Sequence, residues 1–289
     1  MVILRAVLIG MAIVMVGTIP RNILYFANIQ YFNVVPWAVP LVAIYMWFFW
    51  RHLQGYGPPA ETSEHRRILM RAKPLSGYVW FWSLLAGTLG IVALVAGLRF
   101  ANRMIALPEQ TLSDLSQVPR YTMFALLLAS APVAGIIEEI AFRGYMQKPI
   151  EEKYGLFVAI LITGTMFAVA HLDFTLVLWP YYVLVAAIYG TVTYLTNSIL
   201  PAVVLHTCGN LFSNFDLWLH GRAEWQTGSG PETLVWQTGT DNSFWMTGLF
   251  LALMTGLTVL AYIRLARITS RESKATVLNI GHNYEGEVL

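Results

Sequence analysis

The stretch that decides the fold is Gly77–Leu98, GYVWFWSLLAGTLGIVALVAGL, which contains no charged side chain before its end. A second uncharged run, FWMTGLFLALMTGLTVLAYI, occupies Phe244–Ile263. A helix needs about 20 mostly apolar residues to cross the ~30 Å hydrocarbon core of a bilayer. Both runs meet this length, so we expect each of them to span a membrane as one helix.

Six further apolar runs follow along the chain. They are Ala6–Ile19, Val34–Trp50, Tyr121–Ile137, Tyr154–Ala170, Phe174–Leu195 and Ser198–Phe212. The alternation typical of barrel strands is absent from the sequence, and the runs are too long for such strands. The sequence therefore predicts an all-α fold, a polytopic transmembrane helical bundle of about eight spans. We expect residues 1–270 to form a single integral membrane domain and residues 271–289 to form a polar C-terminal tail.

The composition favours a lipid environment and excludes several classes of protein. Of the 289 residues, 57% are apolar and 12% are charged, with a mean hydropathy of +0.59. Soluble domains carry about 25% charged residues, so a cytosolic enzyme is excluded. The net charge of +2 is too small to favour nucleic acid. We therefore expect the lipid bilayer, and no nucleic acid, as a partner. A single cysteine, Cys208, cannot form an intrachain disulfide.

The lysine and arginine residues predict an orientation. If the chain crosses eight times and begins in the cytoplasm, thirteen of its eighteen Lys and Arg residues fall on the cytoplasmic side. The five on the other side are Arg21, Arg99, Arg103, Arg120 and Arg222. Because cytoplasmic loops carry the excess of positive residues, we expect both the N-terminus and the C-terminus to be cytoplasmic.

Six polar residues lie inside or at the ends of the apolar runs. Placing an ionisable side chain in a membrane span costs ~2.5–3.5 kcal/mol on insertion scales, so each such residue is a candidate functional residue. The six are Glu138, Glu139, Arg143, His171, His206 and Asn210.

A spacing of four residues pairs most of these side chains on helical faces. Glu139 and Arg143 have this spacing with the acid first, which favours an ion pair within the helix. Glu138 lies about 100° around the helix, so we expect it to point elsewhere and to remain free. The same spacing relates Phe167 to His171 and His206 to Asn210.

A helical hairpin near Lys153 would bring two of these residues to one depth in the membrane. Glu138 lies 15 residues before Lys153, and His171 lies 18 residues after it. At a rise of 1.5 Å per residue, the two side chains would lie at nearly the same height. This arrangement requires the helix to continue beyond its apolar part, through Arg143–Glu152.

The seventh span leaves a mismatch in depth. His206 lies only about eight residues after Ser198, where this span begins. It reaches the depth of the other polar residues only if spans tilt or break, and Trp179–Pro180 is a possible break because proline disrupts a helix. We expect the active-site cavity to lie among spans four to seven, counted in chain order.

These residue types suit the activation of water. A free glutamate such as Glu138, beside His171, can act as a general base, and no serine or cysteine nucleophile is required. His206 and Asn210 can donate hydrogen bonds to a developing oxyanion. The set is consistent with hydrolysis of an amide bond inside a membrane cavity.

Three ordered motifs carry a resemblance to a known family. E-E-x-x-x-R, F-x-x-x-H and H-x-x-x-N begin at Glu138, Phe167 and His206. In this order the sequence resembles the CPBP family of CAAX proteases and bacteriocin-processing enzymes, which includes the type II CAAX prenyl endopeptidases. The resemblance covers a motif-bearing core of residues 121–215 and implies an intramembrane glutamic endopeptidase that cleaves a membrane-associated protein or peptide.

The resemblance also implies a role for each motif residue. Glu138 and His171 would activate the attacking water, His206 and Asn210 would form the oxyanion site, Glu139 and Arg143 would support or position them, and Phe167 would line the cavity towards the substrate.

Three alternatives stay open. The same fold occurs in non-proteolytic immunity or scaffold proteins, and the polar cluster could serve an ion or metal carrier. A metal-dependent protease is the third alternative, with a divalent metal bound by Glu138, His171 and His206. Because the H-E-x-x-H motif is absent, we expect a mechanism without metal or other cofactor.

Overall fold

The computed structural model of the chain is helical throughout the part that it describes, which comprises residues 1–107, 117–171, 176–221 and 233–285. Helices account for 83% of the residues, and no strand occurs within these ranges. The predicted all-α fold is therefore confirmed.

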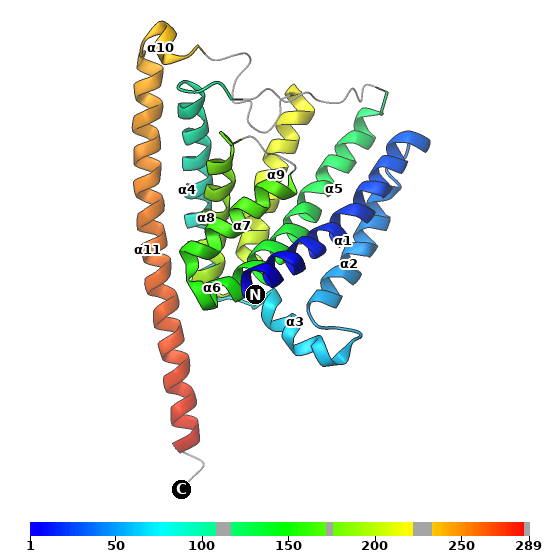
Figure 1. The fold of residues 1–289 in the computed structure, drawn as a ribbon, viewed down its shortest axis with the longest axis vertical. Coiled ribbons are helices and arrows are strands. Elements are labelled where there is room, and N and C mark those ends of the chain that lie inside the picture. Colours follow the sequence, from blue (N-terminus) through cyan, green and yellow to red (C-terminus); the bar gives the residue numbers. More distant parts are fainter. Residues whose placement is uncertain (108–116, 172–175, 222–232, 286–289) are drawn as a thin grey trace.

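The helices follow one another in a simple order (Figure 1). Their bounds are α1 Val2–Tyr31, α2 Ala38–Leu53, the short 3-10 helix η1 Ala60–Thr62, α3 Ser63–Met70, α4 Gly77–Asn102, α5 Arg120–Glu138, the π-helix η2 Glu139–Met146, α6 Gln147–Tyr154, α7 Leu156–Ala170, α8 Trp179–Thr196, α9 Leu200–His220, α10 Val235–Thr238 and α11 Asn242–Glu285.

Each of the eight apolar runs overlaps a helix in its described residues, and several of these helices are long enough for a membrane. Within the described residues, four segments are both long and apolar enough to cross a bilayer: α1, α4, the continuous stretch Arg120–Tyr154 and Asn242–Glu272 of α11. The helices α2 and α7 are apolar but shorter. These segments are those expected of an integral membrane protein, whereas a total of eight crossings stays a prediction.

The structure changes three details of the sequence prediction. Pro180 lies in the first turn of α8, so Trp179–Pro180 starts a helix and does not break one. Arg21 lies inside α1 and Arg143 inside η2, so neither is the loop charge that the orientation count assumed. The polar C-terminal segment is helical as far as Glu285.

The helices pack in pairs that bring distant parts of the chain together. In Figure 1, α11 runs along α4 on one side of the bundle, while α1 and α2 lie on the other side. The helix α5 packs against α9, and α7 packs against α8. The helix α1 also contacts α5 and η2, so it closes the bundle beside the motif-bearing helices.

The predicted hairpin is present. The segments α5, η2 and α6 form one continuous helical stretch, which ends at Tyr154. Gly155 follows with a φ of +84°, a left-handed conformation that glycine adopts without a steric penalty, and α7 begins at the next residue. The helix that carries Glu138 therefore turns back immediately into the helix that ends beside His171.

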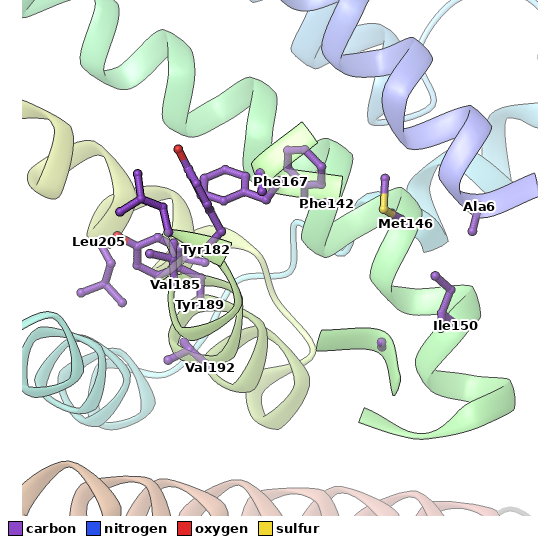
Figure 2. Packing of buried hydrophobic residues seen from close by; sticks show 14 residues of the cluster. Ala6, Phe142, Met146, Ile150, Phe167, Tyr182, Val185, Tyr189, Val192 and Leu205 are labelled. Atoms are coloured by element: carbon purple, nitrogen blue, oxygen red, sulfur yellow. The ribbon is translucent and has the colours of Figure 1, made fainter. Parts of the chain in front are cut away.

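Close helix contacts set the position of the motif-bearing helices. A Cβ atom on Gly135 of α5 would lie 2.7 Å from Oγ1 of Thr207 on α9, so only glycine permits this approach. Behind this contact, the rings of Phe142 on η2 and Phe167 on α7 meet edge to face at 5.2 Å, beside Tyr182 of α8 (Figure 2). This packing fixes α5, α7, α8 and α9 around a common centre.

Candidate active site

A buried ion pair lies at the base of the polar cluster. Nη1 of Arg143 is 3.2 Å from Oε1 of Glu139, and both side chains are 0% exposed. The guanidinium lies 5.2 Å from the ring centre of Phe167 and 5.4 Å from that of Tyr189, which allows cation–π contacts. The pair predicted from the spacing of four residues is therefore present and is enclosed by aromatic rings.

His206 of α9 lies between the two glutamates of the first motif. Its Nδ1 is 2.7 Å from Oε1 of Glu139, and because a carboxylate accepts hydrogen bonds, Nδ1–H is the donor. Its Nε2 is 3.6 Å from Oε2 of Glu138. The two glutamates therefore approach different nitrogens of one ring: Glu138 lines the cavity, whereas Glu139 is fully buried beside Arg143. The expectation that Glu138 points in another direction than Glu139 agrees with this placement, but its closeness to His206 was not expected.

His171 is oriented by its own helix. It follows the last residue of α7, and its Nδ1 is 2.9 Å from the carbonyl oxygen of Phe167. A carbonyl only accepts, so Nδ1–H donates this bond and Nε2 is the nitrogen that can accept a proton. The Phe167 ring contacts the rings of both His171, at 4.6 Å, and His206, at 6.1 Å. Phe167 thus separates and orients the two histidines.

A cavity of about 610 Å³ opens beside these residues. Five of the seven predicted site residues line it, namely Glu138, Phe167, His171, His206 and Asn210. The remaining two, Glu139 and Arg143, lie behind the lining as a fully buried pair. The structure thus brings all seven predicted residues into one region, in two layers.

Aliphatic side chains also line the cavity. They belong mainly to α4, α8 and α9 and include Ile91, Leu94, Val95, Leu98, Ile188 and Leu205. Sequence reasoning placed the cavity among spans four to seven and did not include α4 or α1, which also line it. A cavity lined by both apolar and polar side chains can hold an amphipathic chain.

Sequence reasoning missed two residues near the cluster. Tyr189 of α8 stacks on His206, with ring centres 5.2 Å apart and planes inclined by 19°. Its signal is the spacing of seven residues from Tyr182, which puts both tyrosines on one helical face. Arg21 of α1 lines the cavity, and its signal is a charge inside an otherwise apolar N-terminal helix.

The possible metal site can be compared with this geometry. Within the part of the chain that the structure describes, no group of three or more His, Cys, Asp or Glu side chains is arranged to hold a metal ion. Nδ1 of both His171 and His206 is engaged in a hydrogen bond within the protein. The mechanism without metal stays a prediction.

Comparison with known proteins identifies the same region. Residues 120–212 match the model of a family described as type II CAAX prenyl endopeptidase Rce1-like. No curated protein and no solved structure matches the chain. The matched segment begins with α5 and includes all seven predicted site residues, from Glu138 to Asn210. The chain therefore contains an Rce1-like type II CAAX prenyl endopeptidase domain at residues 120–212, as the resemblance of its three motifs to the CPBP family predicted.

Proposed function

We propose that this protein is an intramembrane endopeptidase that hydrolyses a peptide bond of a membrane-associated protein or peptide. The observation that carries the proposal is that Glu138, His171, His206 and Asn210 line one cavity among apolar helices, inside the matched domain. The family supports a protease acting on a peptide at a membrane. The family match does not specify a catalytic mechanism, and we propose one in which Glu138 is the general base.

Glu138 and His171 activate a water molecule in this mechanism. The Glu138 carboxylate takes a proton from water, and the oxygen attacks the carbonyl carbon of the scissile peptide. Nε2 of His171 accepts a second hydrogen bond from the same water and orients it. The new C–O bond forms as the carbonyl becomes an oxyanion; the C–N bond then breaks, and the proton held by Glu138 passes to the leaving amine.

His206 and Asn210 stabilise the oxyanion. The Asn210 amide donates from one helical turn beyond His206. His206 can donate from Nε2 when it is an imidazolium ion, since Nδ1–H is already bound by Glu139. Glu139 then supplies the opposite charge to His206, and Arg143 holds Glu139 in place. These two residues act by positioning His206 and do not touch the substrate.

The membrane arrangement is part of the same proposal. The eight apolar helices each cross the bilayer, residues 1–270 form one membrane domain, and both termini lie in the cytoplasm. The cavity then lies within the membrane, lined by spans four to seven together with α1 and α4. Substrates enter from the lipid side or the interface as part of a membrane-associated chain.

The decisive experiment compares substitutions at Glu138 with a matched control. Purified protein in liposomes is incubated with membrane proteins, and new chain ends are identified by mass spectrometry. We expect Glu138→Gln and His171→Ala to abolish cleavage. Glu152→Gln should cleave normally, because this glutamate is an exposed partner of Lys148 on α6.

Other outcomes distinguish the alternatives. If Glu138→Gln cleaves as well as the wild type, the glutamate mechanism is wrong. If a chelator stops cleavage and added zinc restores it, the enzyme is metal-dependent. A biological effect of the chain that survives Glu138→Gln, with no cleavage by the wild type, would support a non-proteolytic immunity or scaffold role.

A further inference from the structure

The first helix contributes a guanidinium to the cavity from outside the matched domain. Arg21 of α1 lines the same cavity as Glu138 and His171. The match to the endopeptidase family begins only at residue 120, so this arginine lies outside the matched segment. An arginine within an apolar helix is costly to insert in a membrane, and such residues are usually functional.

Close packing fixes the height of Arg21 relative to the motif-bearing helix. A Cβ atom on Gly17 would lie 2.7 Å from Cγ2 of Ile137, so α1 is held directly against the residue before Glu138. Arg21 is four residues after Gly17 and therefore lies on the same helical face, one turn further on. Its Nε and Nη2 donate to Oδ1 of Asn22, at 3.0 and 2.9 Å, which holds the guanidinium from its own helix.

The charged groups around Glu138 differ in what they can contribute to it. Arg143 on η2 forms its ion pair with Glu139, and His206 on α9 donates Nδ1–H to that same glutamate while Nε2 lies 3.6 Å from Glu138. Arg21 and Glu138 carry opposite charges and both line the cavity. Arg21 is thus a cation of the cavity lining that is separate from the ion pair with Glu139.

We propose that Arg21 is a positioning residue for Glu138, whose positive charge draws the carboxylate towards it and so holds that carboxylate directed into the cavity. This inference rests on the proposed function, in which Glu138 is the base that activates water. The physical reason is that opposite charges attract, so a guanidinium fixed on the cavity lining restricts the direction in which a carboxylate on the same lining points. The endopeptidase domain would then depend on α1 for chemistry as well as for packing.

The test compares Arg21→Gln and Arg21→Lys with Arg5→Gln, an exposed arginine on the same helix. Initial rates are measured on one peptide substrate identified by the cleavage experiment. We expect Arg21→Gln to lower kcat about tenfold, which corresponds to about 1.4 kcal/mol in activation free energy, with KM changed less than about twofold. Arg21→Lys keeps the charge and should recover most of kcat, and Arg5→Gln should match the wild type.

Several results would overturn the inference. They are an unchanged kcat in Arg21→Gln, a loss confined to KM, or an Arg21→Lys variant as slow as Arg21→Gln. Thermal unfolding in detergent, equal for the two Arg21 variants, excludes misfolding as the cause of any difference. The Glu138→Gln variant distinguishes a failure of this inference from a failure of the proposed function. If Glu138→Gln is inactive while Arg21→Gln has normal activity, only the role of Arg21 is refuted. If Glu138→Gln is fully active, the proposed function itself is refuted.

Discussion

The buried pair of Glu139 and Arg143 gives a stability prediction whose size follows from the structure. Both side chains are 0% exposed, and their charged atoms are 3.2 Å apart. At an effective dielectric constant of about 20, unit charges at this distance attract by about 5 kcal/mol. Arg143→Met removes the guanidinium and leaves the buried Glu139 with only the hydrogen bond from His206. We therefore expect the free energy of unfolding to fall by about 3–5 kcal/mol, as for other broken buried pairs.

The chain contains a matched control one helix further on. Lys148 and Glu152 have the same spacing of four residues, but their side chains are 15% and 60% exposed. Such a surface pair contributes about 0.3–0.5 kcal/mol, so Lys148→Met should change stability very little. The double variant Glu139→Gln, Arg143→Met leaves no buried charge from this pair. It should therefore be more stable than Arg143→Met alone.

Denaturant titration of the purified protein in detergent micelles measures these differences, with tryptophan fluorescence as the signal from the chain's 10 tryptophans. The reasoning is refuted if Arg143→Met is no less stable than Lys148→Met. It is also refuted if the double variant is less stable than Arg143→Met, because the cost would then not arise from the buried charge of Glu139 that has lost its guanidinium.

Three further predictions concern other parts of the structure. Tyr189→Leu removes the ring stacked on the site histidine and should lower kcat at least about threefold, while Tyr189→Phe keeps the ring and should stay near wild type; equal rates for the two would contradict this. Gly135→Leu inserts a side chain where α5 meets Thr207 of α9, so it should cost about 1–3 kcal/mol of stability and abolish cleavage, measured by unfolding and by rate. Hydrogen bonding to the Arg103 guanidinium lowers the pKa of Asp241, which links the end of α4 to the start of α11. The link contributes its full stability above the ordinary carboxylate pKa and loses it as the pH falls through the lower pKa that Asp241 has in the folded protein. Between pH 7 and pH 3 the free energy of unfolding should fall less in Arg103→Gln than in the wild type, because the variant has no such link to lose. The same fall in both proteins would show that the link is unimportant.

The positions of the helices could be predicted well because they depend on composition. Runs such as Gly77–Leu98 are long and uncharged, and a bilayer accepts such runs only as helices. The exact start of α8 could not be predicted in this way. Phe174, the first residue of the expected sixth span, lies outside the described residues, and α8 begins at Trp179 because Pro180 fits the first turn of a helix.

The sequence could predict which residues form the candidate site, but it could predict less of how they are arranged in space. Spacing along one helix correctly paired Glu139 with Arg143. Spacing along the sequence contains no information on how far α9 lies from α5, and this distance depends on Gly135 meeting α9. It therefore could not show that both glutamates reach His206. Arg21 was misassigned for the same reason, since a charge after an apolar run is normally in a loop.

The π-helix η2 allows one continuous helical stretch to serve two neighbours at different angles. In a regular α-helix, each inserted or deleted residue rotates all later side chains by about 100° relative to the earlier ones. Before η2, Glu138 faces α9; after it, Gln147 donates a hydrogen bond of 3.0 Å to the carbonyl oxygen of Gly190 on α8. The wide turns of η2 rotate the residues after it relative to those before it. The acidic side chains can therefore face α9 while Gln147, further along the same helical stretch, binds α8.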